Sequence, residues 1–331
     1  MTFLVTGASG FIGSAVTRHL IDEGYAVRTL LRPTSDRSNI EGLDVDVVLG
    51  DLMDKSTLAA AVKGCKGLFH VAADYRLWTR RPDLMFKANV DGTRNIVLAA
   101  MEAGVERIVY TSSVAVLGIP KNGSLGDEET PVSYGDMVGS YKQSKYKAEE
   151  TVRDLVDEHG APVVIVNPSA PIGPRDIKPT PTGRMIVEAA AGRMPAYVDT
   201  GLNVAHVDDI AAGHLAAFKT GKVGERYVLG GENLGLADIL AEIADIIGGK
   251  APRFCIPHNL VMPVAFVVEL FAHMIGQDHE PFVTMDSVRM AKKKMFFSCD
   301  KARRELGYNP RPAHDAILDA VVWFKENGYC D

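Results

Sequence analysis

Short apolar runs, often β-branched, alternate with longer stretches of helical periodicity through the first half of the chain. The runs predict strands at Thr2–Thr6, Ala26–Leu31, Asp46–Leu49, Gly67–Val71, Arg107–Thr111 and Pro162–Asn167. The stretches between them predict helices at Phe11–Glu23, Ser56–Val62, Asp83–Ala103 and Ser140–Glu158. Strands and helices that alternate with short loops form a parallel sheet with helices on both faces. We therefore expect an α/β, doubly wound and mostly parallel sheet.

The pattern changes after Pro168. Five prolines between residues 168 and 182 indicate a long shaped loop, and Met185–Arg193 has a helical pattern. Val204–Phe218 is typical of a return to the sheet domain, and Arg226–Leu229 is a seventh predicted strand. The remainder is mostly helical in pattern. We expect a sheet domain at residues 1–170 and 205–230, and a smaller part at residues 171–204 and 231–331.

The longest apolar stretch runs from Leu260 to Ile275. Pro263 interrupts it, and Glu269 and His273 lie within it. It is too short and too polar to span a bilayer. We predict that it forms a core helix. The alternative is a surface that contacts a lipid substrate, which would bring the protein into peripheral contact with a membrane.

Composition is that of a globular protein, with 47% hydrophobic and 24% charged residues in 331. The net charge of −6 is spread along the chain, so no nucleic-acid-binding face is expected. The basic run Lys292–Lys294 is short and typical of a solvated helix end.

The cysteines indicate a reducing compartment. Cys65, Cys255, Cys299 and Cys330 are far apart and show neither metal-ligand spacing nor a disulfide framework. We expect free thiols, no metal site and a cytoplasmic protein. The first apolar run, Phe3–Val5, leads directly into a glycine-rich turn, which is unlike a signal peptide.

A glycine-rich segment, Gly7-Ala8-Ser9-Gly10-Phe11-Ile12-Gly13, follows the first predicted strand and opens the first helix. Glycines allow a sharp turn and a close approach of the backbone to a pyrophosphate. The helix N-terminus then offers free amides and a favourable dipole. Because strand and helix flank the glycines as this mechanism requires, we predict a dinucleotide site here.

The type of dinucleotide depends on the residue after the second strand. NAD sites usually have a carboxylate at this position, whereas this chain has Arg32, whose charge and shape suit a 2′-phosphate. We therefore expect NADP ahead of NAD, with adenine stacking or solvent exposure of Arg32 as the alternative. Asp51 is expected either to bind the adenine amino group or to cap the following helix.

A second group of candidate residues points to proton transfer. Tyr141 and Lys145 lie four residues apart on a predicted helix, so they share one face. An ammonium beside a phenol favours the phenolate and moves its pKa toward the working range. The segment Thr111-Ser112-Ser113 ends a predicted strand, at the sheet edge where ligands bind in open α/β folds. A hydroxyl there can hold a substrate oxygen beside the phenol, or merely form a turn.

The chain resembles the extended short-chain dehydrogenase/reductases, which are built on a Rossmann domain. The resemblance rests on an ordered series of motifs over about the first 230 residues: GASGFIG, GDL, HVAA, NVDGT, TSSVAVLG, YKQSK and HVDD. Within this superfamily it resembles the dihydroflavonol-4-reductase-like enzymes in Val27–Arg32. It resembles the hopanoid-associated sugar epimerase family more closely, in HVAADYRLW, NPSAPIGP and GGENL.

The resemblance implies roles for individual residues. Ser113, five residues before Gly118, would be the catalytic serine, with Tyr141 as the general acid/base and Lys145 as its partner on the nicotinamide ribose. His70 would lie in the cofactor trough. The implied NAD(P)-binding set is Gly7, Ser9, Gly10, Phe11, Ile12, Gly13, Arg32, Asp51, Leu52, Val71, Ala72, Ala73, Asn89, Tyr141, Lys145 and Pro168. The resemblance also implies a homodimer through the helices Asp83–Ala103 and Ser140–Glu158.

One position departs from the nucleotide-sugar epimerase pattern. Leu202 stands where those enzymes have an arginine that clamps the substrate diphosphate, and a leucine cannot do so. We expect an oxidoreductase that moves hydride to or from a carbonyl or alcohol carbon of a bulky apolar or sugar-bearing substrate. The family resemblance alone implies a hopanoid-related compound. The alternative is a sugar epimerase or dehydratase without net redox change. A non-catalytic scaffold is disfavoured because Tyr141 and Lys145 are both present.

Overall fold

The computed structural model describes residues 1–274 and 283–330. Its centre is a seven-stranded sheet in the order β10-β6-β5-β4-β1-β2-β3, with every neighbouring pair parallel. The strands are β1 (Thr2–Thr6), β2 (Ala26–Leu31), β3 (Val45–Leu49), β4 (Gly67–His70), β5 (Arg107–Thr111), β6 (Val163–Pro168) and β10 (Arg226–Leu229). The predicted doubly wound parallel sheet is confirmed, and each strand bound lies within one residue of its prediction.

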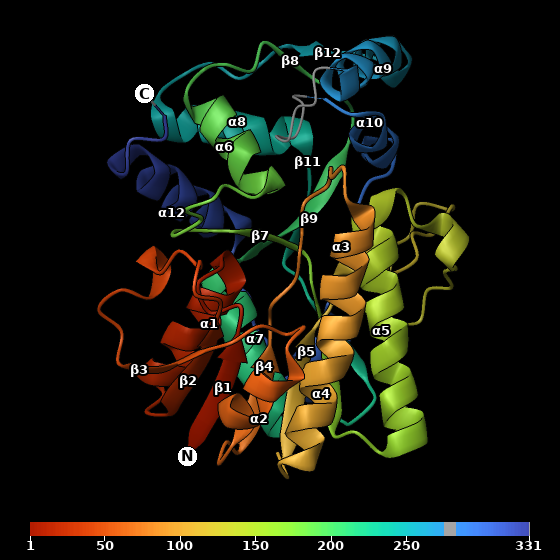
Figure 1. Ribbon diagram of the computed structural model, residues 1–331. Helices are drawn as coiled ribbons and strands as arrows, with labels where there is room; N and C mark the ends of the chain where they lie inside the picture. Colours follow the sequence, from red (N-terminus) through yellow and green to blue (C-terminus); the bar gives the residue numbers. More distant parts are fainter. Residues whose placement is uncertain (275–282, 331) are drawn as a thin grey trace.

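Alternate side chains of the strands enter two separate cores. Phe3 and Val5 pack into a core with α1 (Phe11–Asp22) and α7 (Val207–Thr220). Leu4 points to the opposite face, which is covered by α2 (Lys55–Val62), α4 (Gly92–Glu102) and α5 (Gly139–His159). Helices therefore cover both faces of the sheet (Figure 1). This two-sided burial explains why the strands are continuously apolar.

The helix predicted at Asp83–Ala103 is wrong as a single regular helix. It begins as α3 (Pro82–Phe86), widens into a π-helical turn, η2 (Lys87–Asp91), and continues as α4. Within the turn, Asn89 is buried and hydrogen-bonded to two other segments. A π-helical turn inserts one extra residue and re-aims the following side chains. Short 3₁₀ turns lie at η1 (Ser38–Ile40), η3 (Val114–Val116) and η4 (Tyr134–Asp136).

A smaller lobe lies beyond the carboxyl ends of the strands (Figure 1). It contains a three-stranded sheet of β11 (Glu232–Gly235), β9 (Gly201–His206) and β7 (Ala170–Ile172), and a pair of β8 (Ala196–Tyr197) and β12 (Phe254–Cys255). Its helices are α6 (Pro181–Ala190), α8 (Leu236–Ile247), α9 (His258–Met274), α10 (Met285–Ala291) and α12 (Ala313–Glu326), while α11 (Asp300–Leu306) packs on α7 and β10. The helix predicted at Met185–Arg193 starts four residues earlier because Thr180 caps α6.

The prediction of a core helix at Leu260–Ile275 is wrong for its described part. The segment forms α9, but Leu260, Val267 and Phe271 are 66%, 63% and 58% exposed. The physical reason is that α10 packs on one side of α9 and nothing described covers the other. No helix within the described residues has the length and hydropathy needed to span a bilayer.

Candidate active site

The glycine-rich turn has the geometry that a bound dinucleotide requires. Gly7 has a φ of +74°, and a Cβ there would lie 2.7 Å from the Ala72 amide nitrogen. A Cβ on Gly13 would lie 2.0 Å from the Gly7 carbonyl oxygen. The N-cap residue of α1, Gly10, has no side chain to bind the first helical amides, which include those of Phe11 and Ile12. These residues fit a pyrophosphate, because the glycines bring no side chains into the turn and the helix end has no side-chain cap.

Six further predicted cofactor residues follow the carboxyl ends of β2, β3 and β4, and Pro168 ends β6. Arg32 is exposed directly after β2, and its guanidinium has no ion-pair partner among the described residues. Asp51 accepts a hydrogen bond from the Met53 amide at 2.9 Å, while Asp54 caps α2. Asp54, and not Asp51, is therefore the residue that caps α2. Leu52 would contact a Cβ on Gly92 at 3.1 Å, and Val71–Ala73 follow β4.

Tyr141 and Ser113 lie close to each other. Tyr141 is in the first turn of α5, and Ser113 follows β5, where its hydroxyl accepts the Ala115 amide at 3.1 Å. Burial raises the pKa of Tyr141, and the nearby Ser113 side chain lowers it by less. The phenol is therefore protonated at neutral pH in this structure.

Lys145 is buried one turn further along α5. Its Nζ donates to the Tyr110 hydroxyl at 3.1 Å and to the Thr111 carbonyl oxygen at 2.8 Å. Burial lowers its pKa to about 8. The sequence predicts that Lys145 lowers the pKa of Tyr141. The described residues show no such effect, because the Tyr110 hydroxyl and the Thr111 carbonyl oxygen hold the Lys145 ammonium. The sequence did not predict Tyr110 as a partner of Lys145, since a tyrosine in a central strand is typical of the apolar core.

Asn89 orients the active-site helix from the side. Its Oδ1 accepts the Asp74 amide at 2.7 Å, and its Nδ2 donates to the Asp74 carbonyl oxygen and to Ser144 Oγ, both at 2.9 Å. Ser144 lies between Tyr141 and Lys145 in the sequence. The amide of Asn89 thus ties the loop after β4 to α5. Its contact with the cofactor stays a prediction.

Two buried histidines support the strand ends. His70 accepts or donates hydrogen bonds with Thr6 at 2.7 Å and Thr93 at 2.9 Å, and burial lowers its pKa to about 3. His214 contacts the Ile210 carbonyl oxygen at 2.7 Å and Thr111 Oγ1 at 2.9 Å, and burial lowers its pKa to about 4. Both imidazoles are neutral at pH 7 and act as fixed hydrogen-bonding groups.

Lys142 is a second lysine that sequence reasoning left without a role. Burial and the nearby Lys293 lower its pKa to about 8, and its Nζ lies 3.9 Å from Met295 Sδ. The sequence signal was visible, because YKQSK places a lysine directly after Tyr141.

The ends of β5 and β6 carry buried hydroxyls with no partner among the described residues. These are Ser112 Oγ and Ser169 Oγ, the latter directly after Pro168. Buried polar atoms are normally hydrogen-bonded, so these two hydroxyls are candidates for hydrogen bonds to a ligand or to water. They lie at the sheet edge that also holds Ser113.

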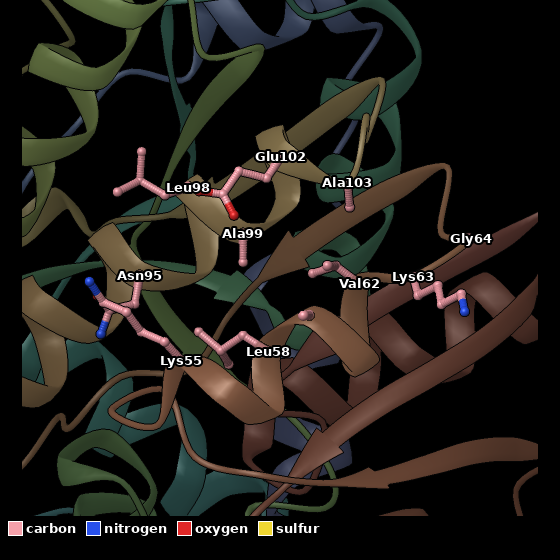
Figure 2. A pocket seen from close by; sticks show the side chains of 11 residues that line it. Lys55, Leu58, Val62, Lys63, Gly64, Asn95, Leu98, Ala99, Glu102 and Ala103 are labelled. Atoms are coloured by element: carbon pink, nitrogen blue, oxygen red, sulfur yellow. The ribbon is translucent and has the colours of Figure 1, made fainter.

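The Leu202 side chain lies in apolar surroundings. It lies in β9 and contacts the apolar core formed by α6, α8 and α12. A separate surface pocket of about 330 Å³ lies between α2 and α4, where Leu58, Val62, Leu98 and Ala99 line it (Figure 2). None of the predicted catalytic or cofactor residues lines this pocket.

Comparison with known proteins yields related sequences and folds. Residues 3–230 match the family described as NAD dependent epimerase/dehydratase. The chain is 45% identical over 331 residues to a putative dihydroflavonol 4-reductase of Synechocystis sp., covering 99% of this chain and 95% of that protein. It is 34% identical over 328 residues to sterol demethylase protein B of Methylococcus capsulatus, covering 99% of both. The crystal structure of gox2253 has a TM-score of 0.89 at 56% identity, covering 99% of each chain.

Proposed function

Since the chain belongs to the NAD dependent epimerase/dehydratase family and is an enzyme of the extended short-chain dehydrogenase/reductase type, we propose that it is an NADP(H)-preferring oxidoreductase. It would move hydride to or from a carbonyl or alcohol carbon of a bulky apolar or sugar-bearing substrate. The observation that carries this choice is Leu202. Its side chain packs in an apolar core at the position where nucleotide-sugar epimerases would need an arginine, so no diphosphate clamp exists there.

The protein groups divide the proton chemistry between them. Ser113 hydrogen-bonds the substrate oxygen and aligns it with the Tyr141 hydroxyl. Because burial keeps Tyr141 protonated, it is ready to donate its proton to a carbonyl oxygen. A reduced dinucleotide held at the glycine-rich turn would supply the hydride, which together with the Tyr141 proton converts the carbonyl to the alcohol. Lys145, whose ammonium is fixed by Tyr110 and Thr111, would hold the nicotinamide ribose.

The preference for NADP(H) rests on Arg32. It is exposed directly after β2, where the ribose of a bound dinucleotide would lie, and it has no ion-pair partner within the described residues. A guanidinium binds a 2′-phosphate through charge-assisted hydrogen bonds. The family itself is described by its use of NAD. NAD is therefore the alternative cofactor.

The substrate class rests on the apolar lobe and on the name of one relative. Sterol demethylase protein B suggests a polycyclic substrate, and a hopanoid-related compound would be one member of that class. The second candidate function is a sugar epimerase or dehydratase without net redox change, which the family description favours. A homodimer across α4 and α5, which pack together on one flank, completes the proposal and is tested by light scattering.

Tyr141→Phe tests the enzyme class. The variant keeps the ring but loses the transferable proton, so kcat should fall roughly 10²–10⁴-fold with little change in cofactor binding. Turnover is measured on a panel of polycyclic and isoprenoid ketones by the absorbance of the reduced nicotinamide. Tyr146→Phe is the matched control, because Tyr146 is on the same helix and packs edge-to-face against Tyr134, with ring centroids 6.1 Å apart.

The same assay separates the two functions. Net loss of reduced-nicotinamide absorbance during product formation identifies a reductase. Product formation without a net change identifies an epimerase or dehydratase and overturns the first proposal. Undiminished turnover by Tyr141→Phe would remove the proton-donor role altogether.

A further inference from the structure

The outer face of α9 and β12 is the most extensive exposed apolar region of the described chain. Eight large apolar side chains are exposed there within 18 residues: Phe254, Ile256, Leu260, Val264, Phe266, Val267, Leu270 and Phe271. Their exposed fractions range from 37% to 74%. The opposite side of α9 packs inward, with Ala265 fully buried. A helix that is apolar on both sides normally has both sides covered.

Exposed cations flank this face along the chain. Lys250 and Arg253 precede β12, and Lys292 follows α10; all three are exposed. His258 Nε2 lies 3.1 Å from the Ala291 carbonyl oxygen, which fixes the end of α10 beside the start of α9. These three cations form no ion pair with a described residue. The whole chain has a net charge of −6, so this cationic rim has the sign opposite to that of the protein as a whole.

We propose that the outer face of α9 docks on the surface of an anionic phospholipid bilayer. Interfacial helices bury Leu, Phe and Val at the boundary of the acyl chains, while flanking lysines and arginines bind anionic headgroups. A second copy of the chain is the weaker candidate, because a two-fold contact would bring equal cationic rims together. This proposal goes beyond the proposed function and does not depend on it.

The docking face lies near the candidate active site. α10 lies between α9 and the start of α5 (Figure 1). A Cβ on Gly139, the first residue of α5, would lie 3.2 Å from Asp286 Oδ2 in α10. Tyr141 follows two residues later. A protein docked through α9 therefore holds the beginning of its catalytic helix one short helix away from the lipid.

Vesicle co-sedimentation with a matched pair of variants tests the proposal. Val267 is 63% exposed on α9, and Val322 is 43% exposed on α12, so Val267→Asp and Val322→Asp make the same change on two surfaces. Wild type and Val322→Asp should bind vesicles containing phosphatidylglycerol. Val267→Asp should lose at least about tenfold in affinity, because apolar burial is lost and a carboxylate meets the anionic surface.

The charge requirement is tested separately. Binding should be much weaker on vesicles of phosphatidylcholine alone, and Lys292→Glu should reduce binding to phosphatidylglycerol vesicles by about fivefold or more. Leu260→Asp, at the most exposed α9 position at 66%, replaces Val267→Asp if that variant does not fold. The proposal is overturned if wild type does not sediment with anionic vesicles or if α9 variants bind as wild type does. It is also overturned if the variants convert a wild-type dimer to monomers without changing vesicle binding.

Discussion

The sheet domain and the smaller lobe differ in how far they bury an aromatic ring, as Phe69 and Phe271 show. Phe69 lies in β4 with no exposed surface, and its ring contacts Phe3 and Phe218 at centroid distances of 5.5 Å. Phe271 lies in α9 and is 58% exposed. The central sheet has a helical layer on each face, whereas among the described residues α9 has a neighbour on one side only. An apolar pattern thus predicts burial only where the fold supplies a second layer.

The largest expected effect is on stability. Phe69→Ala should lower the free energy of unfolding by about 3–5 kcal/mol, because it leaves a cavity in a close-packed core. Phe271→Ala should change it by less than about 0.5 kcal/mol, since the ring is already exposed. Chemical denaturation of both variants measures the difference. Equal losses would mean that α9 is covered in solution, and the contrast between the two regions would not hold.

The same contrast explains what the sequence could predict. Central parallel strands such as Thr2–Thr6 are buried on both sides, so their short apolar runs had unambiguous ends. The glycine turn and the Tyr141–Lys145 spacing were visible because the chemistry fixes residue types at fixed intervals. The π-helical turn around Asn89 was not, since it depends on hydrogen bonds to Asp74 and Ser144 from distant segments. The exposure of α9 was hidden for a similar reason, because hydrophobicity alone does not show which neighbours are missing.

A smaller effect is expected on cofactor affinity, where two exposed arginines are compared, one in each region. Arg32→Ala should weaken NADP(H) binding by about 1.5–3 kcal/mol, the value of a charge-assisted hydrogen bond, and should affect NAD(H) much less. Arg253→Ala, in the lobe, should leave both affinities unchanged. Fluorescence titration measures the four affinities, those of each variant for NADPH and for NADH. A wild-type preference for NAD(H) would refute the role given to Arg32.

The smallest expected effect concerns acid stability, which the buried histidines of the sheet domain should dominate. Burial lowers the folded-state pKa of His70 to about 3 and of His214 to about 4, whereas a histidine in the unfolded chain has a pKa near 6.5. The unfolded state therefore binds more protons as the pH falls below 6.5, and stability is lost from there down toward the folded pKa values. At pH 5 each histidine should cost about 2 kcal/mol relative to pH 7. His70→Gln or His214→Gln should each remove about that much from the difference in unfolding free energy between the two pH values.

Thr93→Val is the control, because it removes the 2.9 Å hydrogen-bond partner of His70 and leaves the titrating ring in place. It should lower stability at both pH values by a similar amount and keep the pH dependence. If the glutamine variants retain the full loss between pH 7 and pH 5, acid sensitivity arises outside these two sites, and the sheet domain is not the region that sets it.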